Sequence, residues 1–210
     1  MLSILFALAG GLLAPERCAA CDVRVRAARV YCPECAATTL PAPEEEAGAA
    51  AFLYGGAIAR SITRFKYEGR RDLARPLSAL LRRLAPHLRE ARIDVVIPVP
   101  LHPLRLAERG YNQAALLGGP LARDLGAVFA PLALRRTRDT AQQATLVRAL
   151  RLTNVEGVFA VRNRRAMEGR RVLIVDDVRT TGATLRECER VVMASGASSV
   201  ITAVLAIAAV

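Results

Sequence analysis

Tryptophan is absent from this 210-residue sequence, and aromatic residues make up only 4% of it. Lys66 is the single lysine, so arginine carries nearly all of the positive charge, a bias to which we assign no function. The arginines are spread along the chain, without the dense basic tract or the interleaved aromatic residues that indicate a nucleic-acid-binding surface. The formal net charge of +11 therefore leaves two interpretations open: contact with nucleic acid, and a solvated basic surface.

The sequence also lacks an apolar run long enough to cross a bilayer. Residues 1–13 are apolar, but no positive residue precedes them and Gly10-Gly11 interrupts them, which argues against a signal peptide. We expect this segment to form an amphipathic or buried helix that packs on the rest of the protein. Because five cysteines without an export signal are typical of a reducing compartment, we predict a cytoplasmic protein.

Neither an internal repeat nor a GxxxxGKS/T or GxGxxG loop occurs, which excludes a solenoid, a Walker nucleotide loop and a dinucleotide fingerprint. What is present is the composition of a soluble globular protein, 53% hydrophobic and 23% charged. The length is sufficient for one α/β core and a small additional unit.

Composition divides the chain into three parts. We predict an N-terminal helix and zinc finger over residues 1–40, a small, Pro-containing acidic linker over 41–50 and an α/β domain over 51–210. Apolar spacing in the third part predicts helices at 57–65, 72–88, 113–125 and 184–195, and strands at 93–99, 127–134, 157–161, 171–175 and 199–207. Continuously apolar strands that alternate with helices indicate a parallel sheet covered on both faces.

Four of the five cysteines form two CxxC pairs separated by ten residues: Cys18, Cys21, Cys32 and Cys35. Two such pairs can complete a tetrahedral thiolate shell, which favours Zn²⁺ over iron and leaves no open position for catalysis. We therefore predict a structural zinc site, with disulfides or a redox pair as the alternatives. Four thiolates around one Zn²⁺ would lower the formal charge by two, to about +9. Cys188 lies in a predicted helix and is expected to be a buried small side chain.

The most specific pattern spans residues 172–184, VLIVDDVRTTGAT. A buried strand is followed by two adjacent carboxylates, Asp176 and Asp177, and ligands of parallel α/β sheets bind beyond the carboxyl ends of strands. Carboxylates accept hydrogen bonds from both hydroxyls of a vicinal diol. A capped turn without a ligand, the alternative, would not need two buried acids.

A Thr- and Gly-rich loop then leads into a helix, where backbone N–H groups and the helix N-terminus favour an anion. The residues we predict to bind a phosphate are Thr180, Thr181, Gly182, Ala183 and Thr184. A ribose 5-phosphate carries both groups, a vicinal diol for the two acids and a phosphate for this loop.

The stretch resembles the signature of type I phosphoribosyltransferases that binds 5-phosphoribosyl-1-pyrophosphate (PRPP): four apolar residues, two acids, then T-T-G-x-T. The resemblance implies that Asp176 and Asp177 hold the ribose hydroxyls and that residues 180–184 hold the 5-phosphate. Mg²⁺ would then be carried by the diphosphate and the ribose hydroxyls of the ligand, with little direct protein ligation.

Further segments narrow the resemblance to the ComF family, a zinc finger joined to a phosphoribosyltransferase-like domain. They are PERC at 15–18, FKYEGR at 65–70, PVP at 98–100, ERGYNQ at 108–113 and RDTAQQ at 138–143. They occur in order over essentially the whole chain. The resemblance implies that the loop around 136–146 closes over bound PRPP. The candidates for the diphosphate or for this loop are Pro100, Arg105, Arg109, Arg136, Thr140 and Gln143. The roles of Lys66, Tyr67, Arg151 and Asn154 stay open.

One departure bears on catalysis, because Thr180 stands where the purine-salvage branch of this fold has an aspartate that handles a proton. The resemblance to ComF implies a protein that binds PRPP and assists the uptake of single-stranded DNA in natural transformation, together with DNA-uptake proteins. Active Mg²⁺-dependent phosphoribosyl transfer to an unknown acceptor and a PRPP-sensing regulator are the alternatives. Oligomerisation is open.

Overall fold

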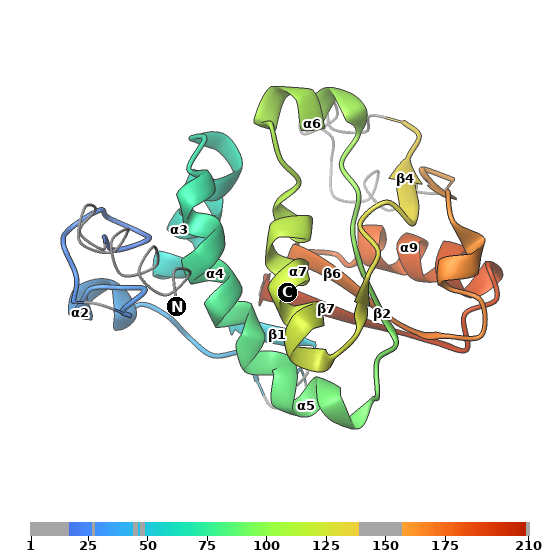
Figure 1. Cartoon of the computed structure of the whole chain (residues 1–210). Helices are drawn as coiled ribbons and strands as arrows, with labels where there is room; N and C mark the ends of the chain where they lie inside the picture. Colours follow the sequence, from blue (N-terminus) through green and yellow to red (C-terminus); the bar gives the residue numbers. More distant parts are fainter. Residues whose placement is uncertain (1–16, 27, 44–45, 47–48, 139–156, 209–210) are drawn as a thin grey trace, which may run out of the picture.

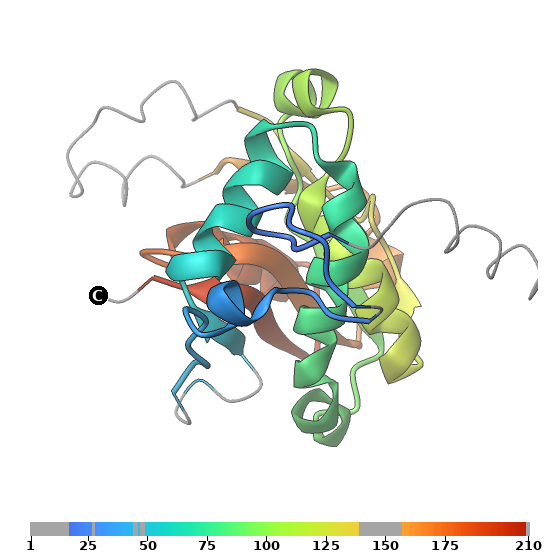
Figure 2. The same cartoon turned by 90° about the vertical axis from the view of Figure 1, so that its left-hand side faces the viewer.

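The computed structural model describes residues 17–26, 28–43, 46, 49–138 and 157–208. A central sheet carries helices on both faces, and the cysteine-containing segment lies at one end of the molecule beside α3 (Gly56–Tyr67), as Figures 1 and 2 show. The helix predicted at 1–13 lies outside the described residues. Among the helices that are described, none has both the length and the apolar character needed to cross a lipid bilayer.

The sheet has five strands, and every pairing between them is parallel. Their spatial order is β1 (Ala50–Leu53), β7 (Ser199–Ile207), β6 (Arg171–Arg179), β2 (Val95–Pro98) and β3 (Val128–Phe129). A separate antiparallel pair consists of β4 (Leu134–Arg136) and β5 (Phe159–Val161). The prediction of an α/β fold with a parallel sheet is confirmed.

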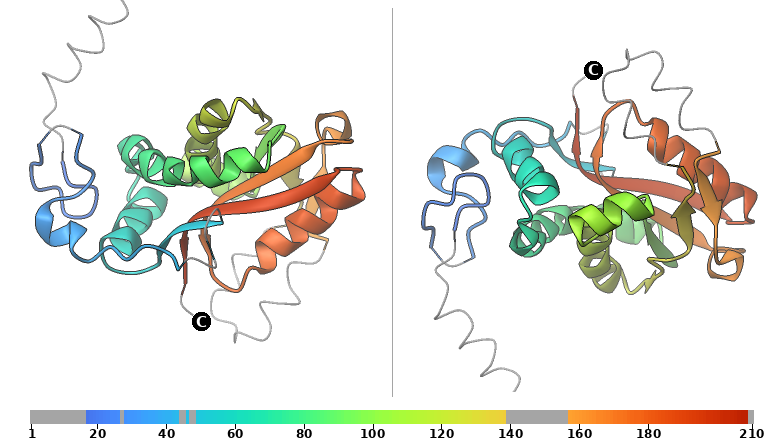
Figure 3. Two further views of the ribbon diagram at one scale, coloured as in Figure 1. Left: turned by 90° about the horizontal axis from the view of Figure 1, so that it is seen from below. Right: turned by 90° about the horizontal axis from the view of Figure 1, so that it is seen from above.

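Two apolar layers cover the sheet, and α7 and α9 lie on its opposite sides (Figure 3). One layer contains α3, α4 (Ala74–Leu81), α5 (Ala85–Glu90) and α7 (Gln113–Leu125). The other contains α9 (Ala183–Ala194) and the β4–β5 pair. The remaining elements are the short helices α2 (Pro33–Ala36) and α6 (Pro103–Arg109) and 3₁₀ turns at Arg71–Leu73, Arg82–Leu84 and Arg164–Ala166.

The centre of the sheet is β6, whose apolar residues alternate between the layers. Leu173 and Val175 pack on the α7 side, and Val172 and Ile174 pack on the α9 side. Helix α7 crosses β6 so closely that a Cβ atom on Gly118 would lie 3.4 Å from the Cβ of Val175. This close approach explains why a helix tolerates glycine at its middle, and it brings the first turn of α7 near the end of β6.

Several elements differ from their predicted bounds. The helix predicted at 72–88 is interrupted, and Pro86 in the first turn of α5 lacks the N–H that would continue the preceding helical ladder. The strand predicted at 171–175 continues to Arg179, because its pairing with β7 persists as far as Ile207. The strand predicted at 127–134 is divided, because β3 covers only Val128–Phe129 and β4 begins at Leu134. Strand β1 and helix α6 were not predicted.

Candidate functional site

A cavity of about 360 Å³ opens where β2 and β6 end. It brings together six of the residues predicted to bind PRPP: Pro100, Arg136, Asp176, Asp177, Thr180 and Thr184. Its other lining residues are Tyr54, Lys66, Val99, Leu101, Gln113 and Val178. A ring of acids, hydroxyls and cations around apolar walls is the composition expected of a site for a small, polar, phosphorylated ligand.

The two acids are part of β6 rather than of the loop beyond it, and strand alternation turns them to opposite faces. Asp177 is 2% exposed and lies on the side of α3, where the Nζ atom of Lys66 is 2.8 Å from its Oδ1 atom. Its Oδ2 atom is buried and has no hydrogen-bond partner among the described residues. A buried carboxylate oxygen without a partner is costly, so its place in a cavity wall fits a ligand hydroxyl.

Asp176 is half-buried, and its Oδ1 atom accepts a hydrogen bond of 2.8 Å from the backbone N–H of Asp177. Burial raises the pKa of Asp176 to about 7, and the charge of Asp177 acts in the same direction. Burial alone would lower the pKa of Lys66, but the charges of Asp177 and Asp176 outweigh it, so the pKa of Lys66 lies above its ordinary value. The cavity therefore holds a charged lysine between two unequal acids.

The loop 180–184 has the backbone expected of an anion site. Gly182 is the residue before α9 and has a φ of +75°, a conformation that glycine adopts without strain. The hydroxyl of Thr181 accepts from the N–H of Ala183 at 3.4 Å, which shapes the turn. The first N–H groups of α9 have no partners within the helix, and the helix dipole is positive at this end. Thr180 and Thr184 face the cavity, whereas the three residues between them are not among its lining residues.

The segment 108–113 positions the cavity from the side of α7. The hydroxyl of Tyr111 donates to the carbonyl of Phe65, and the two rings stack 5.3 Å apart, which fixes the end of α3 that carries Lys66. Asn112 caps α7 by accepting from the N–H of Ala115, and its amide donates to the carbonyl of Val99 at 3.0 Å. This segment thus holds both α3 and the loop after β2 at the cavity.

The predicted arginines divide into two groups. Arg136 lines the cavity, with its guanidinium 5.6 Å from the ring centre of Phe159. Arg105 and Arg109 do not line it: Arg105 pairs with Glu108 at 2.9 Å, and Arg109 bonds the cavity residue Gln113. The other two predicted residues, Thr140 and Gln143, lie outside the described residues, as do Arg151 and Asn154.

Sequence reasoning did not assign Tyr54 and Gln113 to the site, and it left Lys66 open. A signal for Lys66 was available, because the one lysine in a chain rich in arginine lies within the FKYEGR pattern shared with a known family. No comparable signal existed for Tyr54, whose position depends on the strand β1 that was not predicted.

The four cysteines of the N-terminal segment come together, with all their Sγ atoms within 4.8 Å of one another. The Sγ atoms of Cys21 and Cys32 are 3.8 Å apart. Four thiolates at about 2.3 Å from one Zn²⁺ are about 3.8 Å apart, so this donor set fits a tetrahedral zinc ion. Cys188 is buried in α9, as predicted, and burial raises the pKa of its thiol well above the ordinary value.

The cysteine cluster is attached to α3. Arg60 donates to the Sγ atom of Cys35 at 3.4 Å, and the hydroxyl of Thr38 accepts from the N–H of Ala57 at 3.0 Å. Asp22 forms ion pairs with Arg64 and Arg70, which hold the pKa of its carboxyl well below the usual range, at about 2. The N-terminal segment therefore contacts α3 along its length, from Ala57 to Arg64, and the last turn of α3 also carries Lys66 to the acid pair.

Comparison with known proteins identifies the class of domain to which residues 78–209 belong. The phosphoribosyl transferase domain family matches residues 78–209, and together with the parallel sheet this confirms the type I phosphoribosyltransferase fold predicted from the sequence. A purine phosphoribosyltransferase structure from Pyrococcus horikoshii is similar over 63% of this chain and 72% of that chain, with 21% identity and a TM-score of 0.40.

Among curated relatives, the "DNA utilization protein YhgH" of Escherichia coli O157:H7 is 32% identical over 201 residues, which cover 87% of this chain and 86% of the relative. "Competence protein F" of Haemophilus influenzae is 33% identical over 144 residues, 66% of this chain and 63% of that protein. The chain belongs to the ComF/YhgH family of proteins with a phosphoribosyltransferase domain.

Proposed function

We propose that this protein binds PRPP in the cavity at the end of β6. The observation that carries the proposal is Asp177, a buried acid with one oxygen atom that lacks a partner among the described residues, beside Asp176 and ahead of the 180–184 loop. Asp176 and Asp177 accept the hydrogen bonds of the ribose hydroxyls, and the loop with the first turn of α9 holds the 5-phosphate. The backbone after Val99 faces the diphosphate.

Mg²⁺ fits this arrangement as a companion of the ligand. The cavity offers carboxylate oxygens close to the site of the ribose hydroxyls, and Asp176 and Asp177 are the only acidic residues of its described lining, so most ligands of the ion would come from the diphosphate and water. The ion, when present, neutralises charge on the diphosphate. The protein residues bind and orient the sugar, and Lys66 limits the repulsion between the two acids.

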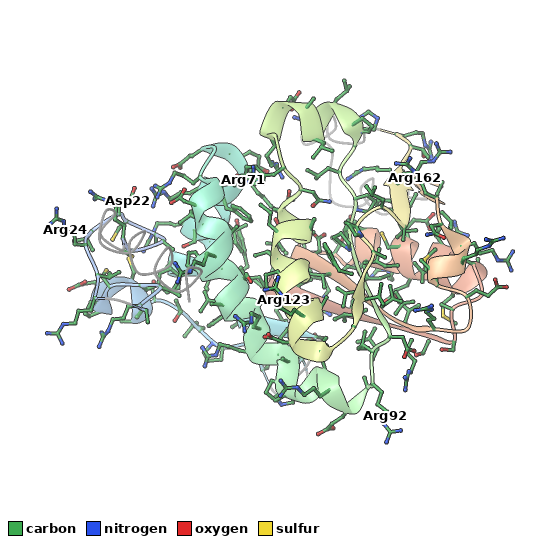
Figure 4. All side chains as sticks on the ribbon, viewed as in Figure 1. Asp22, Arg24, Arg71, Arg92, Arg123 and Arg162 are labelled. Atoms are coloured by element: carbon green, nitrogen blue, oxygen red, sulfur yellow. The ribbon has the colours of Figure 1, made fainter. Side chains whose placement is uncertain are left out.

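The biological role we propose is assistance to the uptake of single-stranded DNA in natural transformation, on the cytoplasmic side. Support comes from the relatives named for DNA utilization and competence and from the formal charge of +11. Exposed arginines such as Arg24, Arg71, Arg92, Arg123 and Arg162 lie on widely separated parts of the surface (Figure 4). Arginines that neutralise DNA phosphates release counterions, so the affinity of such contact falls steeply with salt.

Phosphoribosyl transfer is the second candidate function, favoured by the intact acids and phosphate loop. Thr180 cannot handle a proton near neutral pH, so a transfer reaction would need an acceptor that requires no base from this position. Release of pyrophosphate from PRPP that depends on an added acceptor would select this function. A PRPP-sensing regulator is the function that remains if PRPP binds without turnover and the protein does not bind DNA.

We also propose that the four cysteines hold one structural Zn²⁺ ion, because they supply a closed shell of thiolates. Zinc would fold the segment that lies on α3. The division into residues 1–40, 41–50 and 51–210 stays part of this proposal.

Calorimetric titration of Mg²⁺–PRPP into the zinc-loaded protein tests the binding proposal. We expect saturable binding that is abolished in the Asp176→Asn, Asp177→Asn double variant. Glu90→Gln, which removes an exposed acid on α5, is the control and should bind as the wild type does. A folded wild-type protein that does not bind PRPP would disprove the proposal, and so would undiminished binding by the double variant.

A further inference from the structure

Lys66 is the cation on the α3 side of the cavity, and its environment is unusual for a lysine. Its side chain is only 20% exposed, and its Nζ atom contacts Asp177 at 2.8 Å. An ammonium group has three N–H donors. Within the described part of the chain, Asp177 is its one partner, so donors remain that can serve a ligand in the cavity that Lys66 lines.

The position of this cation is set by packing. Phe65, the preceding residue, is fully buried, stacks on Tyr111 and accepts the hydrogen bond of the Tyr111 hydroxyl at its carbonyl. A lysine held in this way has lost much of its conformational freedom before any ligand arrives. The cost of ordering it on binding is correspondingly small.

The part of PRPP that Lys66 can contact is found by asking which groups of the ligand the other cavity residues already bind. This step rests on the proposed function. The ribose hydroxyls are met by the two carboxylates, and the 5-phosphate is met by the loop before α9. The diphosphate is the anionic group of the ligand that remains. Residues 99–101, which follow β2, line the cavity where it would bind. Pro100 in the middle of this stretch has no N–H group, so the backbone offers the diphosphate one hydrogen-bond donor fewer.

We propose that Lys66 is a ligand-binding residue that contacts the diphosphate end of PRPP while it stays paired with Asp177. It supplies part of the charge neutralisation that would otherwise come from the metal alone. Arg136, the other cation that lines the cavity among the described residues, lowers the pKa of Asp176 through its charge.

The test compares two ligands that share the ribose and the 5-phosphate but differ in the diphosphate, PRPP and ribose 5-phosphate. Both are titrated with Mg²⁺ into the wild type and Lys66→Met at about pH 8.5, above the pKa of about 7 that Asp176 has in the wild type. Protonation of the acids caused by loss of the lysine would weaken both ligands, because both contain the ribose hydroxyls. The other groups near the acids are Arg136 and the buried thiol of Cys188. Arg75→Met removes an exposed positive charge from α4 and is the control, and circular dichroism establishes that each variant is folded.

We expect Lys66→Met to weaken PRPP about tenfold to a hundredfold, the range for a hydrogen bond to a charged group, and ribose 5-phosphate about threefold or less. Lys66→Arg should recover part of the PRPP affinity, and Arg75→Met should change neither ligand. Equal losses for both ligands would overturn the proposal, because Lys66 would then act only through Asp177. Unchanged PRPP affinity would overturn it as well. A wild-type protein that binds neither ligand would instead disprove the proposed function.

Discussion

Asp176 and Asp177 are neighbours on one strand, yet their surroundings differ because alternate residues of β6 face different layers. Asp177 has a cation 2.8 Å from its carboxylate, whereas Asp176 is stabilised by the charge of Lys66 and by a hydrogen bond from one backbone N–H group. Burial, with the charge of Asp177 acting in the same direction, raises the pKa of Asp176 to about 7, so this acid takes up a proton within the physiological range of pH. The two acids are therefore not equivalent as acceptors of ligand hydroxyls.

This asymmetry predicts the pH dependence of PRPP binding. A protonated Asp176 is a poorer acceptor, so affinity should rise between about pH 6 and pH 8 as the carboxyl ionises through its pKa of about 7. Calorimetry across this range measures the effect. Asp176→Asn should bind weakly and keep only the pH dependence that comes from the phosphate groups of the ligand, whose own ionisation lies near pH 6. A wild-type affinity that is constant over the range would contradict the assignment.

At the scale of elements, α3 is the connection between the cysteine cluster and the cavity. Its first turn lies against Thr38, and its last turn carries Lys66. Gly56, at the start of α3, has a φ of +50°, and a Cβ atom there would lie 2.2 Å from the carbonyl oxygen of Thr38. The close approach of the two segments depends on the absence of a side chain at this position.

Gly56→Ala is therefore expected to lower the free energy of unfolding for two reasons, the strained backbone angle and the clash of the new Cβ atom with Thr38. Gly69→Ala is the matched control, because Gly69 has a φ of +66° but a Cβ atom there would have no described neighbour within 4 Å. We expect a loss in the free energy of unfolding of about 1 kcal/mol for Gly69→Ala and about 2–4 kcal/mol for Gly56→Ala. Urea denaturation of the zinc-loaded variants measures both, and equal losses would show that the contact with Thr38 is unimportant.

The elements that were predicted well are those whose local pattern agrees with their packing. The helix at 113–125 has a capping asparagine before it and a glycine after it, and strand 199–207 is mostly apolar; both have the predicted bounds. The strand at 171–175 was predicted too short, because acids at its end suggest a loop. Its pairing with β7, a contact between distant residues, continues the strand through Asp176 and Asp177.

For the site, too, the contiguous residues could be predicted from the sequence more completely than those that packing between distant segments brings in. The acids and the phosphate loop are contiguous in sequence, so their pattern could be recognised without a structure. Lys66 and Gln113 reach the cavity from α3 and α7, and only the packing of those helices on the sheet brings them there. Arg105 carries a suitable charge but lies on α6, which has no buried residues and holds it away from the cavity lining.

At the scale of the whole molecule, the N-terminal segment brings its four cysteines into one cluster. Its buried apolar side chains, among them Ala19, Ala20 and Tyr31, join the core layer that contains α3. Polar contacts add to this packing, because Arg60 and Arg64 of α3, and Arg70 beyond it, contact Cys35 and Asp22. A segment of this size needs a metal or a similar crosslink to fold stably.

We therefore expect one Zn²⁺ per chain and a lower melting temperature after its removal by a chelator. Cys21→Ser should lose the zinc, and because Cys21 is exposed this loss reports the metal rather than packing. Cys188→Ala, which removes the buried cysteine outside the cluster, should keep a full equivalent. Elemental analysis and thermal unfolding measure the two effects. Zinc bound equally by Cys21→Ser and the wild type would contradict the four-cysteine site.

The most direct test of PRPP binding at the end of β6 is a crystal structure of the zinc-loaded protein with Mg²⁺ and PRPP. We predict density for the ribose hydroxyls at the carboxylates of Asp176 and Asp177, with the 5-phosphate on the backbone of residues 180–184. A ligand found elsewhere on the molecule, or an empty cavity at a saturating concentration of PRPP, would contradict this prediction.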